Sequence, residues 1–436
     1  MAGEGGYTLP SVNTLEETLA ELRLTLSLDD LGVVRRALAG RLREGAREDG
    51  GEVPMLPAWL APPRAGLHGE AIAIDAGGTN LRAAHVVAGE GGEVRILGAV
   101  HEEPLPGAAG REEATADAFF AAHARLVRRL GAADALPIGY CFSYPSAVSP
   151  DGDAVLLRWT KEVRVPGVEG ARVGALLSEH LRRNGVVPGP VFVLNDTIAT
   201  LAAGSLAPEV ARRRAVGLIV GTGFNMGAYL PVALLKKLAP SPDGWRSELM
   251  AVNFESGAFS PPGLGPADAE VDLASLEPGA QRFEKAVSGA YLGRLFAAAA
   301  KRLGVALPAH GASECAVASA EVSRLAVEEA GSPAGVLARA LLDRSADLVA
   351  AALAATADVM GGEGDLHVGA EGSLIVKGPG FAARVGATLD RMLAEGGGAG
   401  RSRITFGRDA NLAGSALAAL APQTSPPQPP SPCPGP

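Results

Sequence analysis

Short apolar runs alternate with longer stretches in which apolar residues recur every three or four positions, and this alternation continues over most of the chain. The first pattern is typical of buried strands and the second of amphipathic helices. The predicted strands cover residues 71–74, 81–87, 94–100, 138–142, 191–194 and 216–220. The predicted helices cover residues 111–130, 173–183, 199–206, 281–303 and 333–358. Strands that alternate with helices indicate an α/β fold.

Two amphipathic helices are predicted before the first strand. Thr14 and Glu17 form a capping box ahead of leucines at helical spacing, and Ser27 with Asp30 predicts the start of a second helix. Prolines and a glycine then interrupt the periodicity between residues 54 and 66. We therefore expect a boundary between two lobes in this segment.

A strand, a glycine-rich turn that leads to an asparagine, and a second strand occur in this order at two places. The first copy contains Asp75-Ala-Gly-Gly-Thr-Asn80 and the second contains Val220-Gly-Thr-Gly-Phe-Asn225. The repetition suggests two lobes built on one duplicated plan. Coincidence is the alternative, because glycine-rich turns between buried strands are common.

The composition excludes several classes of partner. The chain has 436 residues, which allows two domains with separate cores. Its 39 basic residues are spread out and give a net charge of −9 against 48 acidic ones, so nucleic acid is not an expected partner. No apolar stretch approaches the ~20 residues of a membrane span, and the N-terminus does not resemble a signal peptide. We expect a cytoplasmic protein that does not bind membranes.

The cysteines and the last residues add little chemistry. Cys141, Cys315 and Cys433 are far apart and lack the spacing of a disulfide framework or a zinc site. Residues 422–436 are rich in Pro, Ser and Gln and cannot form a core, so we predict a disordered tail. A ligand for a proline-recognition domain is the alternative for this tail.

The turn within residues 75–80 is a candidate phosphate site. It contains no lysine and precedes no predicted helix, so it is neither a P-loop nor a dinucleotide fingerprint. Its two glycines allow close approach of the backbone, whose N–H groups can hold phosphate oxygens. Thr79 adds a hydroxyl, Arg82 adds a positive charge, and Asp75 is placed to hold magnesium through water. A tight hairpin without a ligand is the alternative.

A second glycine-rich turn and an acidic residue complete the candidate catalytic chemistry. Gly221-Thr-Gly223 offers more backbone N–H donors, which we expect to face the first turn across a cleft. Asn195 and Asp196 directly follow an apolar run, and ligand crevices of open α/β sheets lie at strand ends. Asp196 is therefore a candidate catalytic base. The alternative is that Asp196 caps the helix that follows it.

Other polar residues are weaker candidates when each is taken alone. Ser143 also ends a predicted strand, and Lys161 follows a loop rich in Pro, Asp and Gly. Glu284 lies at a predicted helix start, and Glu255 lies in a short segment between apolar residues. A lone lysine is more often a solvated surface residue, and carboxylates in the first turn of a helix usually stabilise its dipole.

The order of these segments resembles that of the hexokinase family. The resemblance covers nearly all of the chain outside the predicted tail, and its longer segments are far more specific than a glycine-rich turn. The segments that carry it are Met55-Leu-Pro57, Asp75-Ala-Gly-Gly-Thr-Asn80, Phe142-Ser-Tyr-Pro145, Trp159-Thr-Lys161, Asn195-Asp-Thr197, Gly221-Thr-Gly-Phe-Asn225, Asn253-Phe-Glu-Ser-Gly-Ala-Phe259, Gln281-Arg-Phe-Glu-Lys-Ala-Val-Ser-Gly289 and Glu371-Gly-Ser373.

The resemblance implies a two-lobed α/β fold of the actin/hexokinase/Hsp70-like ATPase superfamily, which is ribonuclease H-like. Each lobe would be a mixed five-stranded sheet with flanking helices, and the active site would lie in the cleft between the lobes. The expected small domain covers residues 67–210, with 411–421 as a candidate addition. The expected large domain covers residues 13–66 and 211–410.

The resemblance also implies a reaction. ATP with Mg²⁺ would phosphorylate the 6-hydroxyl of a hexose for glycolysis, with glucose as the expected substrate and fructose or mannose as alternatives. Asp196 would act as the base beside Lys161, and Asp75 would hold magnesium through water. The sugar would be bound by Ser143, Thr160, Lys161, Asn195, Asp196, Asn225, Glu255, Gln281 and Glu284. ATP would be bound by Asp75, Gly77, Gly78, Thr79, Asn80, Arg82, Gly221, Thr222, Gly223, Gly372, Ser373 and Asn411.

The chain departs from the family pattern at three places. Ser256 stands where the family usually has Trp, and Tyr144 replaces the usual second Phe of a Ser-Phe-Pro turn. The family's adenosine-binding turn appears as Arg408-Asp-Ala-Asn-Leu-Ala-Gly414. The alternatives are a catalytically weak sugar sensor, another sugar kinase of the superfamily, and a filament-forming or chaperone-like ATPase, against which the sugar-side residues argue. We expect a monomer or a homodimer.

Overall fold

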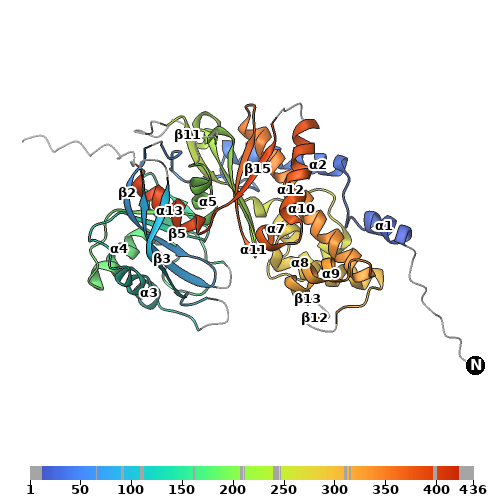
Figure 1. Ribbon diagram of the computed structural model, residues 1–436, viewed down its shortest axis with the longest axis horizontal. Helices are drawn as coiled ribbons and strands as arrows, with labels where there is room; N and C mark the ends of the chain where they lie inside the picture. Colours follow the sequence, from blue (N-terminus) through green and yellow to red (C-terminus); the bar gives the residue numbers. More distant parts are fainter. Residues whose placement is uncertain are drawn as a thin grey trace, which may run out of the picture.

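Two lobes make up the molecule (Figure 1). The computed structural model describes residues 12–64, 66–89, 93–108, 112–160, 163–206, 210, 212–238, 245, 247–308, 312–313, 316–395 and 400–421. Lys161, Cys315, Cys433 and the predicted tail lie outside these ranges. Each lobe contains its own β-sheet, called here the first sheet and the second sheet, so the predicted two-lobed α/β fold is confirmed.

The first sheet combines antiparallel and parallel strands. Its strands in spatial order are β4 (Val94–Pro104), β3 (Asn80–Ala88), β2 (Gly69–Ala76), β5 (Ile138–Phe142) and β8 (Val191–Leu194). β3 pairs antiparallel with β2 and β4, whereas β5 runs parallel to β2 and to β8. The sheet is therefore mixed and five-stranded as predicted.

Helices cover both faces of the first sheet. Ile72 of β2 packs with residues of α3 (Ala116–Arg129) and α4 (Val173–Arg183). Ala73, the next residue, packs on the opposite face with α13 (Ala410–Leu420). Because successive side chains of a strand point to opposite faces, the large residues of β2 meet one helical layer and the small ones meet the other.

The second sheet has six strands, so the prediction of five is wrong for this lobe. Its strands in spatial order are β1 (Leu56–Pro57), β11 (Leu249–Asn253), β10 (Phe224–Pro231), β9 (Ala215–Val220), β14 (Leu366–Glu371) and β15 (Ser402–Phe406). The additional strand, β1, comes from the proline-rich segment between residues 54 and 66, in which no strand was predicted. It pairs antiparallel with β11 at the sheet edge, where a proline is tolerated. β14 runs parallel to its neighbours, so this sheet is also mixed.

Two helices, α5 (Asp196–Gly204) and α13, lie between the sheets (Figure 1). α5 contacts β9 and β14 of the second sheet, and α13 contacts β2 and β5 of the first. A Cβ atom on Gly414 would lie 1.8 Å from the carbonyl oxygen of Ala199, and one on Gly139 would lie 1.9 Å from that of Ser415. Only glycine permits these approaches, so the helix pair joins the two sheets at close range.

The predicted helix at residues 281–303 is two helices, α7 (Arg282–Val287) and α8 (Gly289–Leu303). Ser288 between them has extended backbone angles, φ −88° and ψ 156°. The N–H group of Gly289 donates to the carbonyl oxygen of Gly221 at 2.8 Å instead of continuing the first helix. The hydrogen bond to the turn at Gly221 therefore divides residues 281–303 into two helices, although their apolar periodicity predicts one.

The start of each of three helices differs from its prediction because of local capping. α1 (Val12–Glu21) already includes Thr14, which is therefore not its cap. α3 begins five residues later than predicted because Thr115 caps it, accepting a hydrogen bond from the N–H group of Ala118 at 3.1 Å. α5 begins three residues earlier than predicted because Asn195 caps it.

Ser27 does cap α2 (Leu28–Arg47), and its N–H group donates to Asp30 at 2.9 Å, as the capping box predicts.

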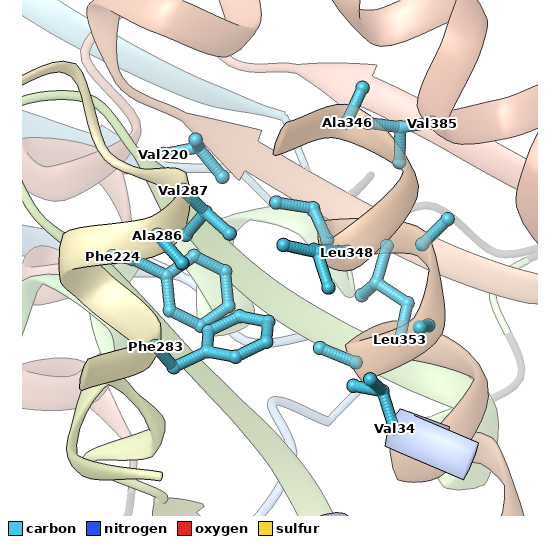
Figure 2. Packing of buried hydrophobic residues seen from close by; sticks show 14 of the residues in the cluster. Val34, Val220, Phe224, Phe283, Ala286, Val287, Ala346, Leu348, Leu353 and Val385 are labelled. Atoms are coloured by element: carbon cyan, nitrogen blue, oxygen red, sulfur yellow. The ribbon is translucent and has the colours of Figure 1, made fainter. Parts of the chain in front are cut away.

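The core of the second lobe surrounds α10 (Pro333–Met360). Figure 2 shows Leu348 of this helix beside Phe224 of β10 and Phe283 of α7. The two phenylalanine rings have centroids 4.9 Å apart. This core therefore fixes β10 and α7, which carry candidate site residues.

The remaining helices are α6 (Pro266–Leu273), α9 (Ser319–Glu328), α11 (Ser373–Lys377) and α12 (Phe381–Glu395), with 3-10 turns at Arg212–Arg214, Val232–Leu234, Lys236–Leu238 and Ser256–Ala258. Short hairpins are formed by β6 (Ser146–Val148) with β7 (Ala154–Leu156), and by β12 (Ala312–Ser313) with β13 (Ala316–Val317). Within the described ranges, no helix combines the length and the apolar character that crossing a membrane requires.

Candidate active site

Three candidate residues lie at one edge of the first sheet. Asp75 is at the end of β2, Ser143 follows β5 and Asn195 follows β8. These three strands are parallel neighbours, so their carboxyl ends open at the same edge, as expected for ligand crevices of α/β sheets. The N–H group of Ser143 donates to the carbonyl oxygen of Ala76 at 3.2 Å, which joins the segment after β5 to the turn after β2.

Asp196 is the first residue of α5, and Asn195 caps that helix. The Asn195 Oδ1 atom accepts a hydrogen bond from the N–H group of Thr197 at 3.0 Å, and Asp196 Oδ1 accepts from the same group at 2.8 Å. The alternative reading, in which Asp196 is the cap, is therefore wrong. The carboxylate of Asp196 sits at the positive end of the helix dipole, which stabilises negative charge.

The turn after β2 joins two antiparallel strands and opens no helix, as predicted. The N–H group of Gly77 donates to the carbonyl oxygen of Asn80 at 3.1 Å, Gly78 is partly buried, and Thr79 is exposed. The side chain of Asn80 donates to Glu102 at 2.5 Å. The turn is thus closed by its own backbone, and its threonine hydroxyl is accessible to a ligand.

Asp75 is buried, with 5% of its surface exposed, and is paired with Arg82. The guanidinium of Arg82 contacts Asp75 Oδ2 at 2.6 Å and Asp409 Oδ1 at 3.0 Å. The second carboxylate oxygen of Asp75, Oδ1, is buried and has no hydrogen-bond partner. A buried oxygen without a partner costs free energy, so this atom fits a ligand such as a water of a hydrated magnesium ion.

The second glycine-rich turn joins β9 to β10 and is fixed by the start of α8. The N–H groups of Gly289 and Ala290 donate to the carbonyl oxygens of Gly221 at 2.8 Å and Thr222 at 3.3 Å. Within the turn, the N–H group of Gly221 donates to the carbonyl oxygen of Gly223 at 3.0 Å. The first turn of α8 is therefore used to hold this turn in place.

Gly372 and Ser373 lie directly beside this second turn. β14 and β9 are parallel neighbours, and a Cβ atom on Gly221 would lie 3.1 Å from the Ser373 nitrogen. Gly372 has φ +118°, and a Cβ atom on it would lie 2.4 Å from the carbonyl oxygen of Val220. A glycine is required there, and the structure brings together two segments that the sequence placed far apart.

A chain of amide and carboxylate groups runs along the end of the second sheet. Asn225 Nδ2 donates to Asn253 Oδ1 at 2.7 Å, and Asn253 Nδ2 donates to Glu255 Oε1 at 2.8 Å. The N–H group of Phe224 donates to Glu284 Oε2 at 3.0 Å. Asn253 was not among the predicted site residues, although an amide that ends an apolar run two residues before Glu255 is a signal in the sequence.

Three residues other than glycine have left-handed backbone angles at the site. They are Glu255 with φ 56°, Gln281 with φ 51° and Asp409 with φ 55°. Such conformations cost on the order of 1–3 kcal/mol each and persist where the surrounding structure imposes them. A Cβ atom on Gly257 would lie 2.7 Å from Gln281 Oε1, so Gln281 packs next to the segment that carries Glu255.

Glu371 is a third carboxylate near Asp75 and Asp196, and it was not among the predicted site residues. The pKa of Glu371 is raised from 4.5 to about 7, first by burial and then by the negative charges of Asp75 and Asp196. The hydroxyl of Thr200 donates to Glu371 Oε2 at 3.3 Å. The amide nitrogen of Asn411, in the orientation that satisfies its neighbours, donates to the same oxygen at 2.8 Å and to the Asp196 carbonyl at 3.3 Å.

A cavity is lined by residues of both lobes, and Asn195 is the candidate site residue among them. Asn195 and Tyr144 line it from the first lobe, and Asn253 and Leu56 line it from the second. Thr160 is partly buried, and its carbonyl oxygen accepts from Val163 at 3.2 Å. Among the described side chains, no group of three or more His, Cys, Asp or Glu is arranged to hold a metal ion directly.

Known proteins of one family are similar to this chain in sequence. Family models described as hexokinase match residues 15–206, and residues 215–308 with 328–421. Hexokinase-3 of Mus musculus is 36% identical over 289 residues, which cover 64% of this chain and 30% of that protein. Hexokinase-2 of Candida albicans is 34% identical over 289 residues, which cover 63% and 58%. The match thus spans less than two thirds of either relative.

The fold is also similar to that of a solved structure. The hexokinase from Schistosoma mansoni complexed with glucose superposes with a TM-score of 0.78 and 24% sequence identity. The superposition covers 94% of this chain and all of that one. At this identity the likeness concerns the arrangement of the two lobes.

Proposed function

Because the chain belongs to the hexokinase family, we propose that it transfers the γ-phosphoryl group of ATP to the 6-hydroxyl of a hexose, first of all glucose, to supply glycolysis. The observation that carries the proposal is the position of Asp196. It follows β8 at the sheet edge that also presents Asp75, and its charge is close enough to raise the pKa of Glu371. The proposal thus places this carboxylate at the sheet edge that also carries the candidate phosphate turn.

Asp196 is the proposed base. Phosphoryl transfer needs little covalent help from the protein, so orientation and charge neutralisation dominate. The carboxylate accepts the proton of the sugar hydroxyl as that oxygen attacks the γ-phosphorus atom. The N-terminus of α5 stabilises the negative charge of Asp196 before the proton arrives.

The hexose hydroxyls are proposed to be bound from both lobes. The hydrogen-bonded chain of Asn225, Asn253 and Glu255 orients amide and carboxylate groups in advance. Asn195 uses its oxygen to cap α5, which leaves its amide nitrogen as a donor for a sugar hydroxyl. The other proposed sugar contacts are Ser143, Thr160, Lys161, Gln281 and Glu284. A sugar that lacks one hydroxyl would leave a buried polar group unpaired and bind more weakly, and glucose is proposed ahead of fructose and mannose.

ATP is proposed to bind between the turn after β2 and the adjoining turns at Gly221–Gly223 and Gly372–Ser373. Both regions present backbone N–H groups at strand ends, where phosphate oxygens can approach. Asp75 would hold hydrated magnesium through Oδ1, the oxygen that lacks a partner. When bound, magnesium neutralises charge that develops on the phosphates.

The proposed domains are residues 67–210 with 411–421, and residues 13–66 with 211–410. Packing of α13 against β2 supports the assignment of its residues to the first domain. The cavity bordered by Asn195 and Asn253 supports a substrate site between the two domains.

The direct test is Asp196→Ala in a coupled assay with ATP, Mg²⁺ and a panel of hexoses. We expect kcat to fall by about 10²–10⁴-fold because the base is lost. Hexose binding, measured by calorimetry, should weaken by no more than about tenfold because the other polar contacts remain. Asp29→Ala is a matched control, since Asp29 is also in the first turn of a helix but is exposed on α2.

Two outcomes would change the proposal. Turnover by Asp196→Ala close to that of the unmodified protein would remove Asp196 as the base. Binding of a hexose by the unmodified protein without phosphorylation of any sugar would favour a sensor.

A further inference from the structure

Tyr144 connects the segment after β5, which carries the proposed sugar contact Ser143, to the turn after β2, which is proposed to bind phosphate. It follows β5, and only 1% of its surface is exposed. Its ring packs against Phe142 and Trp159, with both pairs of centroids 4.8 Å apart. Its hydroxyl group donates a hydrogen bond to the backbone carbonyl oxygen of Gly77 in the turn after β2.

This hydrogen bond extends the attachment of β2 to β5 beyond the end of the sheet. The parallel pairing stops at Ala76 and Phe142. The N–H group of Ser143 then donates to the carbonyl oxygen of Ala76 at 3.2 Å. The Tyr144 hydroxyl bonds the next carbonyl group, that of Gly77, which no backbone group of β5 reaches. A phenylalanine at this position would keep the ring packing and lose the bond.

We propose that Tyr144 is a positioning residue that fixes the phosphate turn relative to the sugar-binding segment and to Asp196. The inference depends on the proposed function, because it assumes that the turn after β2 holds phosphate groups of the nucleotide. The hydroxyl acts by limiting the positions of the Gly77 backbone.

The surroundings keep the hydroxyl in its donor form. Burial raises the pKa of Tyr144 above its ordinary value, and the negative charges of Asp75 and Asp196 raise it further. The hydroxyl therefore keeps its proton at neutral pH. The hydroxyl is therefore within electrostatic range of Asp75, the proposed magnesium ligand, and of Asp196, the proposed base.

Tyr144→Phe is the test, because it removes one oxygen atom from a buried ring and leaves the shape of the core intact. We expect KM for ATP, and the dissociation constant of Mg²⁺-ATP measured by calorimetry, to rise by about five- to tenfold, since a carbonyl of the turn loses its partner. The dissociation constant of the hexose should stay within about twofold. A merely structural role would lower the melting temperature without separating the two substrates.

Tyr140→Phe is the matched control. Its hydroxyl is also fully buried and hydrogen-bonded, to His123 Nε2 at 3.0 Å, in the core between α3 and the first sheet. Loss of that bond should lower stability and leave the dissociation constant of ATP unchanged. The pair of variants thus separates loss of a buried hydrogen bond from loss of the link to the turn.

The outcomes distinguish this inference from the proposed function. Unchanged ATP affinity in Tyr144→Phe, or an equal loss for ATP and hexose, would overturn the inference while the kinase assignment stands. If the unmodified protein binds ATP and transfers nothing, the calorimetric comparison still decides the role of Tyr144. If it binds no ATP, both proposals are wrong.

Discussion

The carboxyl group of Glu371 lies at the junction of the lobes, next to side chains that come from β2, α5 and α13. Its pKa of about 7 exceeds the ordinary 4.5 because burial and the charges of Asp75 and Asp196 disfavour its ionised form. The folded protein therefore holds this proton more tightly than the unfolded chain does. Between these two pKa values, a rise in pH removes protons from the unfolded state first, so the contribution of Glu371 to stability falls.

We predict that Glu371→Gln removes this pH dependence. The difference between the pKa values, 4.5 and about 7, corresponds to at most about 3 kcal/mol, because Glu371 is partly exposed and solvent screens its charge. Relative to the unmodified protein, the variant should gain stability from pH 5 to pH 8. Urea unfolding at both pH values in metal-free buffer measures this gain, with the exposed Glu48→Gln as control. Parallel pH profiles for both variants would contradict it.

Polar residues that follow a strand predicted from the sequence could be identified, and roles that depend on distant neighbours could not. Asn195 and Asp196 follow a buried apolar run, which is a local signal. The pKa of Glu371 and the partners of Asn253 depend on side chains from other strands and helices. No spacing in the sequence encodes those contacts, and the placement of Arg82 between two carboxylates was hidden for the same reason.

At the scale of elements, the approach of α5 to α13 is the feature with the strictest steric demand. A Cβ atom on Gly414 would lie 1.8 Å from the carbonyl oxygen of Ala199. Neither helix can move away freely, because α5 packs on the second sheet and α13 on the first. Since Asp196 begins α5 and Asn411 belongs to α13, this contact also sets the relative position of site residues.

Gly414→Ala is therefore expected to lower the free energy of unfolding by about 1–3 kcal/mol through overpacking. The control is Gly40→Ala on α2, where an added Cβ atom meets no atom within 4 Å. That substitution should raise stability by up to about 1 kcal/mol, since alanine favours helix. Urea unfolding of both variants tests the expectation, and a Gly414→Ala protein at least as stable as the parent would refute it.

Elements with strong local signals were predicted with their observed bounds, as β5, β8 and α4 show. Their apolar runs end at Pro, Gly or polar residues that stop the pattern. The break at Ser288 and the strand β1 were missed because each depends on a partner elsewhere in the chain, the turn at Gly221 and the edge of β11. Local pattern thus located many elements before residue 220 together with α10, whereas β11, β14, β15, α12 and α13 were not predicted.

At the scale of the whole molecule, the two lobes also meet through an exposed ion pair. Arg158, after β7, has its Nη1 atom 3.9 Å from Oε1 of Glu277, which follows α6. Half of the Arg158 side chain and 64% of that of Glu277 are exposed, so the pair is weak and screened by salt. It lies close in sequence to the proposed sugar contacts Thr160 and Gln281.

We predict that Glu277→Lys weakens hexose binding by about two- to fivefold at low ionic strength, because like charges then face each other where the lobes meet. In 0.5 M salt, where the Debye length is only about 4 Å, the difference should disappear. The control is Glu248→Lys, which disrupts an exposed pair with Arg213 beside the second sheet. A loss of affinity that persists in high salt would show that Glu277 acts in another way.

The position of α13 has a consequence for biosynthesis. The first sheet is complete once β8 has left the ribosome, yet the helix that covers its alanine-rich face is translated only after the entire second sheet. Until then that face stays uncovered, and nascent chains expose it to chaperones and to one another. A chain that terminates before α13 would therefore have an uncovered face on its first sheet, and its Glu371 would lack the amide donor from Asn411.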